Sequence, residues 1–242
     1  MKIAGISDVG KVRPNNEDNV AFGHLEDAVY AIVCDGMGGA VSGEEASSIA
    51  VETIQEKIQA AYSPKMNAAA LERMLVSSIT AANFKIYDYA VKNEKQGMGT
   101  TAVVAIMKPN FVVIGYDGDS RAYLVHDTIR QLTSDHTFLN ELYRLGKITK
   151  EEMEADPRKN IITRALGVGE EIEVDTLCED IVPGDTVLLC SDGLTNCLND
   201  ENILELIQSR TTDNAVKVLI DKANENGGVD NITAALLFNE EV

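Results

Sequence analysis

Five aspartates of this chain stand beside short apolar segments, directly before one, directly after one or a few residues beyond its end: Asp18, Asp35, Asp119, Asp192 and Asp230. A strand end holds a side chain rigidly, and a following glycine lets the backbone turn sharply so that a bound ion can approach. Several such ends converging would form an all-oxygen cation site. Carboxylates, carbonyls and water suit magnesium or manganese, whereas three histidines are too few for an imidazole-rich zinc site.

A simpler interpretation of these aspartates is also open, because Asp-Gly is among the commonest turn dipeptides. Each pair taken alone, such as Asp35-Gly36 or Asp192-Gly193, fits a turn better than a metal ligand. Spacing alone therefore leaves the turn and the metal site as alternatives.

Composition sets the class of protein. The 242-residue chain carries 39 acidic and 21 basic side chains, a formal net charge of −18, and 45% hydrophobic residues. This predicts one globular domain over 1–242 and argues against nucleic-acid or anionic-membrane partners. The longest apolar stretches, of about seven residues, are far below the roughly 20 that span a bilayer, so we expect no membrane insertion. An early polar N-terminus and four cysteines without a CxxC pair predict a cytoplasmic protein.

The elements that must position these residues follow from the apolar patterns. Eight strands are predicted, at 3–7, 19–22, 28–34, 101–107, 111–116, 120–125, 187–191 and 232–238. Helical patterns lie at 42–62, at 67–94, after Thr149, and from about 200 and 212. Capping boxes at Ser42 and Thr149 mark two helix starts. Clustered strands with paired helices favour an α+β fold with antiparallel neighbours over alternating βαβ units. The polar segment 135–164 is predicted to be an insertion.

Other catalytic chemistries lack their patterns. No cysteine has an arginine six residues later, as a tyrosine-phosphatase nucleophile requires, and neither GxxxxGK[ST] nor GxGxxG occurs. One enzymatic alternative stays open. Asp117-Gly118-Asp119 after an apolar strand resembles the start of haloacid-dehalogenase phosphatases, although Arg121 departs from that pattern and the motif lies in mid-chain.

Six short motifs occur in order along the chain: GxxRxxNED at 10–18, DGMGG at 35–39, GTT at 99–101, GDSR at 118–121, SDGL at 191–194 and DNIT at 230–233. In these motifs and their order the sequence resembles the metal-dependent protein phosphatases, the type 2C serine/threonine phosphatase family, in its compact bacterial form. The resemblance covers Gly5 to Leu237. It implies a four-layer αββα sandwich of two mostly antiparallel sheets flanked by helices, with a flap at about 138–160.

The resemblance also implies which residues hold metal. Asp35 would bridge two ions of manganese or magnesium, and the carbonyl of Gly36 would ligate one of them. Asp192 and Asp230 would complete the first metal.

Asp18 would act on the second ion through its water ligands, with Glu17 as an alternative for that role. Asp119, together with Asp192, would hold a possible third ion.

The implied reaction is hydrolysis of phosphoserine and phosphothreonine in proteins by direct attack of a metal-bridging hydroxide. Arg13, Asp35 and Asp192 would be the catalytic residues. Arg13 offers a planar fork that suits two phosphate oxygens, and its alternative role is an ion pair with Glu17. Many eukaryotic relatives carry a histidine as general acid where this chain has Met37, so metal-bound water or His136 would have to replace it.

The compact bacterial form implies phosphorylated proteins as partners, among them a serine/threonine kinase that the enzyme opposes. An alternative from another class is a catalytically inactive regulator of the same fold that binds phosphoprotein or metal. Met37 favours the regulator, whereas the presence of Asp35, Asp192, Asp230 and Arg13 favours the enzyme.

Overall fold

The structure is a computed structural model that describes residues 1–38, 42–158, 161–208 and 212–240. Gly39, the last residue of the DGMGG motif, and the end of the predicted flap at 159–160 lie outside these residues.

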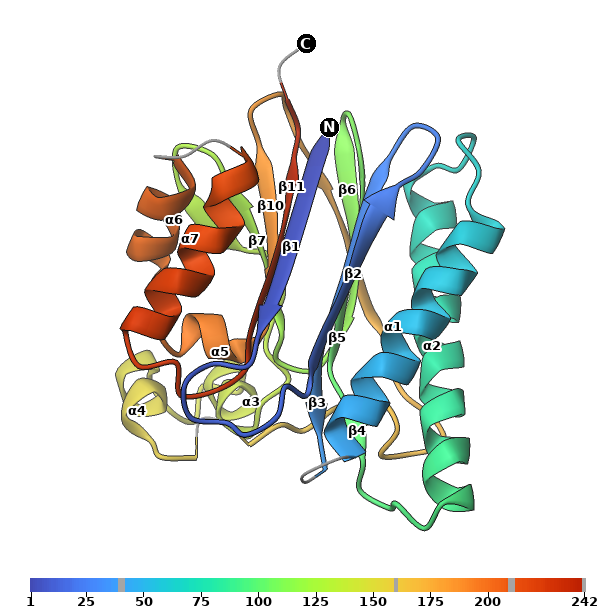
Figure 1. Ribbon diagram of the computed structural model, residues 1–242, viewed down its shortest axis with the longest axis vertical. Coiled ribbons are helices and arrows are strands. Elements are labelled where there is room, and N and C mark those ends of the chain that lie inside the picture. The colour runs from blue at the N-terminus through green and yellow to red at the C-terminus, as the bar shows by residue number, and fades with distance from the viewer. Residues whose placement is uncertain (39–41, 159–160, 209–211, 241–242) are drawn as a thin grey trace.

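Two antiparallel sheets form the centre of the molecule (Figure 1). Sheet A has the order β1 (Lys2–Asp8), β11 (Ile232–Phe238), β10 (Thr186–Cys190), β7 (Arg121–Val125) and β8 (Ile129–Gln131). Sheet B has the order β2 (Asp18–His24), β3 (Val29–Met37), β5 (Ala102–Lys108), β6 (Phe111–Asp117) and β9 (Asp175–Asp180), with β4 (Gly99–Thr100) paired to β3. The first and last strands of the chain thus lie side by side, with Lys2 opposite Phe238.

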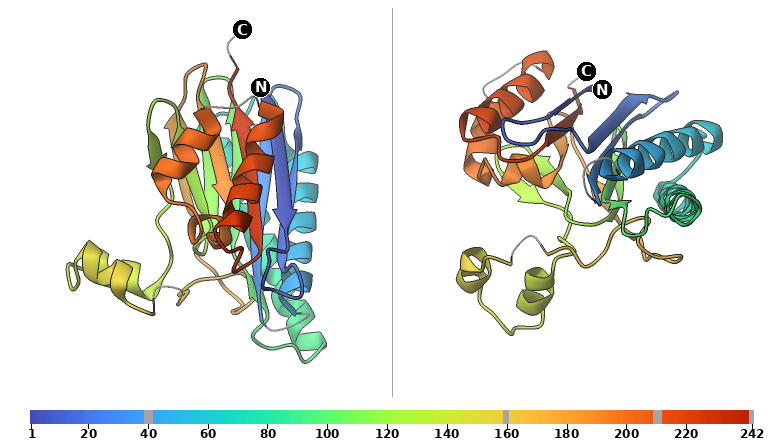
Figure 2. Two further views of the ribbon diagram at one scale, coloured as in Figure 1. Left: turned by 60° about the vertical axis from the view of Figure 1, so that its left-hand side comes forward. Right: turned by 60° about the horizontal axis from the view of Figure 1, so that its bottom comes forward.

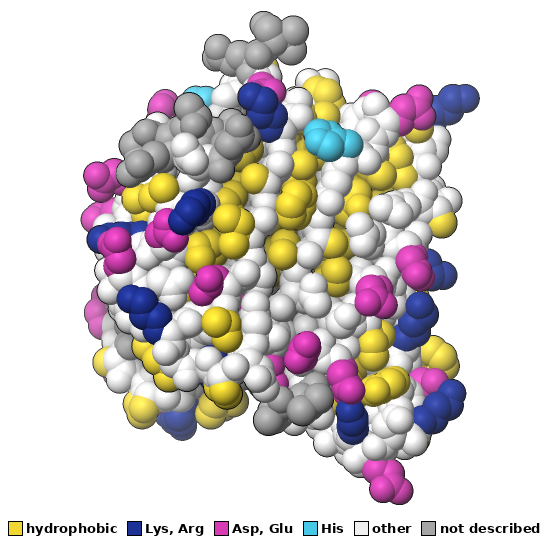
Figure 3. All heavy atoms as spheres, viewed as in Figure 1, with side chains coloured by type: hydrophobic (Ala, Val, Ile, Leu, Met, Phe, Trp, Pro, Cys, Tyr) yellow, Lys and Arg dark blue, Asp and Glu magenta, His cyan; other side chains and the backbone are white. Residues whose placement is uncertain are grey.

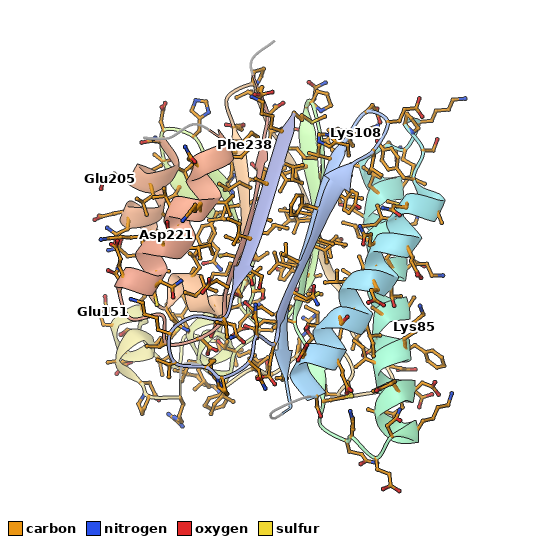
Figure 4. The ribbon with its side chains drawn as sticks, viewed as in Figure 1. Lys85, Lys108, Glu151, Glu205, Asp221 and Phe238 are labelled. Atoms are coloured by element: carbon orange, nitrogen blue, oxygen red, sulfur yellow. The ribbon has the colours of Figure 1, made fainter. Side chains whose placement is uncertain are left out.

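Helices cover the outer face of each sheet. The pair α1 (Ser42–Ala61) and α2 (Ala68–Lys92) packs on sheet B, and α5 (Asp192–Thr195), α6 (Asp200–Gln208) and α7 (Thr212–Glu225) lie on the side of sheet A (Figure 1). The four layers confirm the predicted αββα sandwich. In Figure 4 side chains fill the space between the sheets, while Glu205 lies on the outer side of α6. Among the described residues, no helix is long and apolar enough to cross a membrane.

Burial on both faces explains the apolar character of the central strands. Val33 and Val103 belong to the core between the sheets, whereas Ile32 and Val104 belong to the core beneath α1 and α2. Alternate residues of these strands face two different cores, so the strands read as continuous apolar runs. The edge strands β1 and β2 are less covered, and Figure 3 shows hydrophobic side chains along the seam between them.

All eight predicted strands are present, with ends within three residues of the prediction. The predicted helices also begin as expected: Asn67 caps α2, and Thr149 with Glu152 forms a capping box at the start of α4 (Lys150–Ala155). Five short elements are absent from the prediction, namely β4, β8, β9, α3 (Phe138–Arg144) and α5. Each is too short or too polar for its period to stand out.

The segment predicted as a flap contains α3 and α4. Both helices project from the sandwich on the side where the strands carrying the aspartates end (Figure 2). We call residues 138–158 the flap.

Candidate active site

A cleft of about 480 Å³ opens at the end of both sheets where the motif segments meet. Its walls contain six of the seven predicted site residues, and the complete lining is Arg13, Pro14, Asn15, Glu17, Asp35, Gly36, Met37, Gly38, Asp119, Ile162, Asp192, Asp230 and Asn231. The seventh, Asp18, lies directly opposite Asp35 in the β2–β3 register. The structure therefore brings residues from five separate motifs to one place.

Asp35 is fixed by its backbone near the end of β3. Its N–H donates to Thr101 Oγ1 at 3.0 Å, and its carbonyl accepts from the Thr101 N–H at 2.8 Å and from Thr100 Oγ1 at 2.9 Å. Thr101 Oγ1 also bonds Ser120 Oγ at 2.7 Å, which ties this strand end to the GDSR turn. The GTT motif thus holds Asp35 and the Asp119 turn at a set spacing.

Gly36 occupies a position that no larger residue fits. A Cβ built there would lie 2.2 Å from the carbonyl oxygen of Gly43 and 2.6 Å from that of Glu17. The Gly36 N–H donates to the Glu17 carbonyl at 3.1 Å, so the backbones of two motifs and of the first turn of α1 meet around it. This close approach leaves the peptide of Gly36 in the wall of the cleft.

Asp192 and Asp18 are linked through one serine. Ser191 Oγ donates to Asp18 Oδ2 at 2.7 Å, and Asp192 begins the four-residue helix α5 next to it. Asn196, one turn along, donates its Nδ2 to Asp192 Oδ2 at 3.0 Å. A Cβ on Gly193 would lie 1.9 Å from the carbonyl oxygen of Asn231, so glycine is required here as well.

Asp230 is bound on both of its oxygens. Arg13 Nη2 donates to Oδ2 at 2.8 Å, and the Asn231 N–H donates to Oδ1 at 2.9 Å. The predicted alternative, an ion pair of Arg13 with Glu17, is not the pair that forms. Glu17 lines the same cleft, and its buried Oε1 has no hydrogen-bond partner among the described residues.

Asn231 is a site residue that the motif analysis missed. Its Oδ1 accepts from the Glu17 N–H at 2.8 Å, and its Nδ2 donates to the carbonyls of Val9 and Asn15 at 2.9 Å each. The side chain thereby pins the loop that carries Arg13. Its position next to Asp230 in the DNIT motif is the feature of the sequence that could have identified it.

The electrostatics of the cleft are those of crowded, buried carboxylates. Burial, and then repulsion from Asp192, raises the pKa of Asp119 to about 7. Burial likewise raises the pKa of Asp18 to about 7, against the hydrogen bond from Ser191 that lowers it. The pKa of Asp35 lies well above its usual range, first through burial and then through repulsion by Asp18 and Asp192.

These carboxylates suit a divalent cation. Within the part of the chain that the structure describes, Asp119 Oδ1 is buried without a hydrogen-bond partner, and the donor set is all oxygen, as magnesium and manganese prefer. Within the described ranges, however, no three Asp, Glu, His or Cys side chains form a cluster that could hold an ion by itself. A cation here therefore needs further donors such as the Gly36 carbonyl and water, or different carboxylate contacts.

His136 does not lie in the cleft wall. It is 5% exposed, its Nδ1 accepts from the Gly118 N–H at 3.0 Å, and its Nε2 lies 3.1 Å from Asp175 Oδ2. The ring stacks on Tyr116, with centroids 5.2 Å apart. These contacts make His136 a support for the turn before Asp119, so the structure contradicts its expected availability as a proton donor.

Asp117 is not available as a nucleophile either. It is 1% exposed, and its Oδ1 accepts from Arg164 Nε at 2.9 Å. The haloacid-dehalogenase alternative needs an accessible first aspartate, and this burial excludes it.

A second hollow of about 330 Å³ continues from the cleft toward the flap. It shares Asp119 and Asp192 with the cleft, and the flap contributes Leu139, Asn140 and Met153 to its wall. A chain entering the cleft would meet these flap side chains next to the carboxylates.

Comparison with known proteins agrees with this geometry. The profile of the family described as "Protein phosphatase 2C" matches residues 11–231. The serine/threonine phosphatase stp of Listeria innocua is 43% identical over 96% of this chain and 93% of its own length.

Solved structures show the same fold. A serine/threonine phosphatase of S. agalactiae superposes with a TM-score of 0.92 at 33% identity, over 99% of each chain. The catalytic domain of the phosphatase PstP, solved in complex with two manganese ions, superposes with a TM-score of 0.83 at 34% identity, over 97% of this chain and 96% of that domain. The family match and these identities agree with the motif order and the sandwich, and the chain therefore belongs to the protein phosphatase 2C family.

Proposed function

We propose that this chain is a metal-dependent protein phosphatase that hydrolyses phosphoserine and phosphothreonine in proteins. The observation that carries the proposal is the convergence of Asp35, Asp119, Asp192 and Asp230 on one cleft, beside an arginine. Family membership supports the same reaction. An inactive regulator would not need to keep every carboxylate of this set.

The metal ligands remain part of the proposal. Asp35 and the Gly36 carbonyl, with Asp192 and Asp230, would hold two ions of manganese or magnesium, and Asp119 with Asp192 would hold a third. When bound, such ions lower the pKa of a coordinated water and offset the negative charge of the phosphoryl group. The two manganese ions in the related PstP domain support this assignment without deciding between the metals.

The second-ion role of Asp18 is favoured over Glu17 by position. Asp18 faces Asp35 across two strands and is held by Ser191, so its distance from the bridging carboxylate is set by the sheet. Glu17 lines the cleft from a loop instead.

The chain's own residues orient the substrate. Arg13 presents its guanidinium at the cleft with half of its side chain exposed, so it can bind two phosphate oxygens of an incoming phosphoprotein. Met37 lines the wall and has no proton to donate, so the alkoxide that leaves on P–O cleavage must take its proton from another group.

The biological setting is inferred from the family resemblance. We include a serine/threonine kinase among the phosphoprotein substrates, and we place the enzyme in the cytoplasm. All four cysteines are free thiols, as in a reducing compartment.

Phosphate release from a phosphothreonine peptide, measured with manganese and with excess EDTA, tests the function. Turnover that requires the metal is expected, and Asp35→Asn should abolish it while circular dichroism shows a folded protein. Turnover that survives EDTA would contradict the metal mechanism. A folded, manganese-binding protein without turnover would support the inactive regulator.

A further inference from the structure

Arg13 and a metal ion need the same atom. Arg13 Nη2 donates to Asp230 Oδ2 at 2.8 Å, while Asp230 Oδ1 is engaged by the Asn231 N–H at 2.9 Å. Both carboxylate oxygens therefore have a donor in front of them. A cation that occupies the position now taken by Nη2 in front of Asp230 Oδ2 has to displace the guanidinium.

Resting on the proposed function, we infer that Arg13 is a built-in competitor for the cation at Asp230, and that cation binding transfers Arg13 from this carboxylate to the substrate phosphate. Arg13 is a positioning residue in the first state and a substrate-binding residue in the second.

Charge explains why Arg13 pairs with Asp230. Several carboxylates line the cleft. An ionised carboxylate without a positively charged partner is destabilised there by repulsion from its neighbours. Arg121, the other arginine near the cluster, is already bound to Asp135 through two nitrogens, at 2.7–3.0 Å, and to the Tyr123 hydroxyl at 3.0 Å. Of these two arginines, Arg13 is therefore the one whose guanidinium pairs with Asp230.

Exposure explains why the pair can open. The side chains of Arg13 and Asp230 are 52% and 29% exposed, so separating them costs little compared with breaking a buried pair. The loop that carries Arg13 stays in place meanwhile, because Asn231 holds it through the carbonyl of Asn15 and the N–H of Glu17. Only the arginine side chain has to move.

This arrangement couples the two ligands of the enzyme. A cation on Asp230 releases Arg13 for phosphate, and by reciprocity phosphate on Arg13 leaves Asp230 open to the cation. Phosphate affinity should therefore be low until the metal is bound, even though Arg13 itself is no metal ligand.

Calorimetric titration of EDTA-stripped protein with manganese alone tests the inference. Arg13→Ala should bind manganese about fivefold more tightly than the unmodified protein, the scale expected for losing one partly exposed ion pair. Lys11→Ala removes an exposed positive charge from the same loop and should change the affinity by less than about twofold.

A double-mutant cycle separates competition from general repulsion between cations. In an Asp230→Asn background Arg13 has no carboxylate to occupy, so Arg13→Ala should leave the affinity for the remaining ion unchanged. An unchanged or weaker affinity of Arg13→Ala alone would overturn the inference. So would an equal gain in the Asp230→Asn background or in Lys11→Ala.

Failure of the inference and failure of the proposed function give different results. A folded parent protein that binds no manganese would refute the function itself. A parent that binds manganese and turns over phosphopeptide, but whose affinity does not respond to Arg13→Ala, would refute only the competition.

Discussion

Asp18 and Asp119 are both enclosed to more than nine-tenths, and this enclosure lifts the pKa of each to about 7. Near neutral pH each carboxyl is therefore divided between its protonated and ionised forms, unlike an ordinary aspartate, which is fully ionised. A divalent ion bound as proposed would favour the ionised form, because it would offset the repulsion among the cleft aspartates. Metal binding would then be coupled to the loss of protons at these residues.

The stability of the metal-free protein should fall as pH rises from about 5 to about 8. Unfolded aspartates release protons near the ordinary value of 3.8, whereas Asp18 and Asp119 in the folded protein keep theirs until about 7. Between these values the folded state binds more protons, so its free energy of unfolding decreases as pH rises. Calorimetry in EDTA measures the trend, and excess manganese should flatten it. A melting temperature that climbs over this range in EDTA would contradict the prediction.

Asp35→Asn should separate activity from stability. Turnover should drop by more than about 100-fold, because the variant would lack the carboxylate proposed to bridge the two ions. The metal-free melting temperature should rise, because one of several repelling carboxylates is removed. Phosphopeptide kinetics and thermal melts check the two effects. Asp221→Asn, on the exposed surface of α7 (Figure 4), is the control and should leave both unchanged. Near-normal turnover in Asp35→Asn would remove this residue from the site.

At the scale of elements, the site depends on tight contacts between strand ends and loops. Gly36 and Gly193 each let a backbone approach that a side chain would block, and Asn231 ties the N-terminal loop to the last strand. Contacts of the same kind flank the flap: His136, which precedes it, accepts from the Gly118 N–H, and Arg164, which follows it, donates to Asp117. The cleft is therefore built where several elements end.

Gly193→Ala should destabilise the protein by about 2 kcal/mol, because the new methyl group would meet the Asn231 carbonyl oxygen at 1.9 Å. Gly169→Ala is the matched control, since its nearest neighbour is an oxygen at 3.5 Å, and it should change stability by less than about 0.5 kcal/mol. Urea unfolding of both variants measures the difference. Equal stability of the two would show that the contact at Gly193 relaxes freely.

The flap should act on protein substrates more than on small ones. Met153→Ala removes an apolar side chain from the hollow beside the cleft, so kcat/KM for phosphopeptides should fall about threefold to tenfold. Hydrolysis of p-nitrophenyl phosphate should stay the same, because this substrate is too small to reach the flap. Glu151→Ala, on the exposed surface of α4, is the control. A parallel loss on both substrates would place Met153 in the chemistry or the fold instead.

At the scale of the whole molecule, the strong negative charge acts on every approaching substrate. A net charge of −18 attracts divalent cations and repels acidic phosphoproteins. Dissolved salt screens the repulsion between the enzyme and an acidic phosphoprotein. The association of the two therefore depends on the salt concentration.

The KM for a phosphopeptide with acidic flanking residues should therefore fall as sodium chloride rises from about 25 to about 250 mM, whereas the KM for a basic phosphopeptide should rise. Initial rates at a fixed manganese concentration measure both. A change in the same direction for both peptides would show that salt acts on the enzyme rather than on the encounter.

Local signals predict the strands, the paired helices and the α+β class, whereas the four layers and the set of site residues are implied by the resemblance that six ordered motifs carry. Asp35 and Asp192 follow apolar strands and precede glycine, and this pattern needs no partner to be visible. The missed features depend on distant contacts. The Glu17–Asn231 bond joins residues 214 positions apart, and the Arg13–Asp230 pair joins residues 217 apart. The spacing of apolar residues along the sequence does not indicate such pairs. With four residues, α5 is also too short to show the apolar repeat of a helix.

The place of β11 in sheet A has a consequence for synthesis on the ribosome. All strands of sheet B lie before residue 181, so that sheet and α1 and α2 can assemble while the rest is still being translated. Sheet A cannot be completed by then, because among the described strands the sheet partner of β1 is β11, which lies between β1 and β10 and is translated last. Asp230 lies two residues before the start of that strand. If Asp230 holds a metal as proposed, a nascent chain lacks the complete carboxylate set, and phosphatase activity should begin only once the last strand has joined the first.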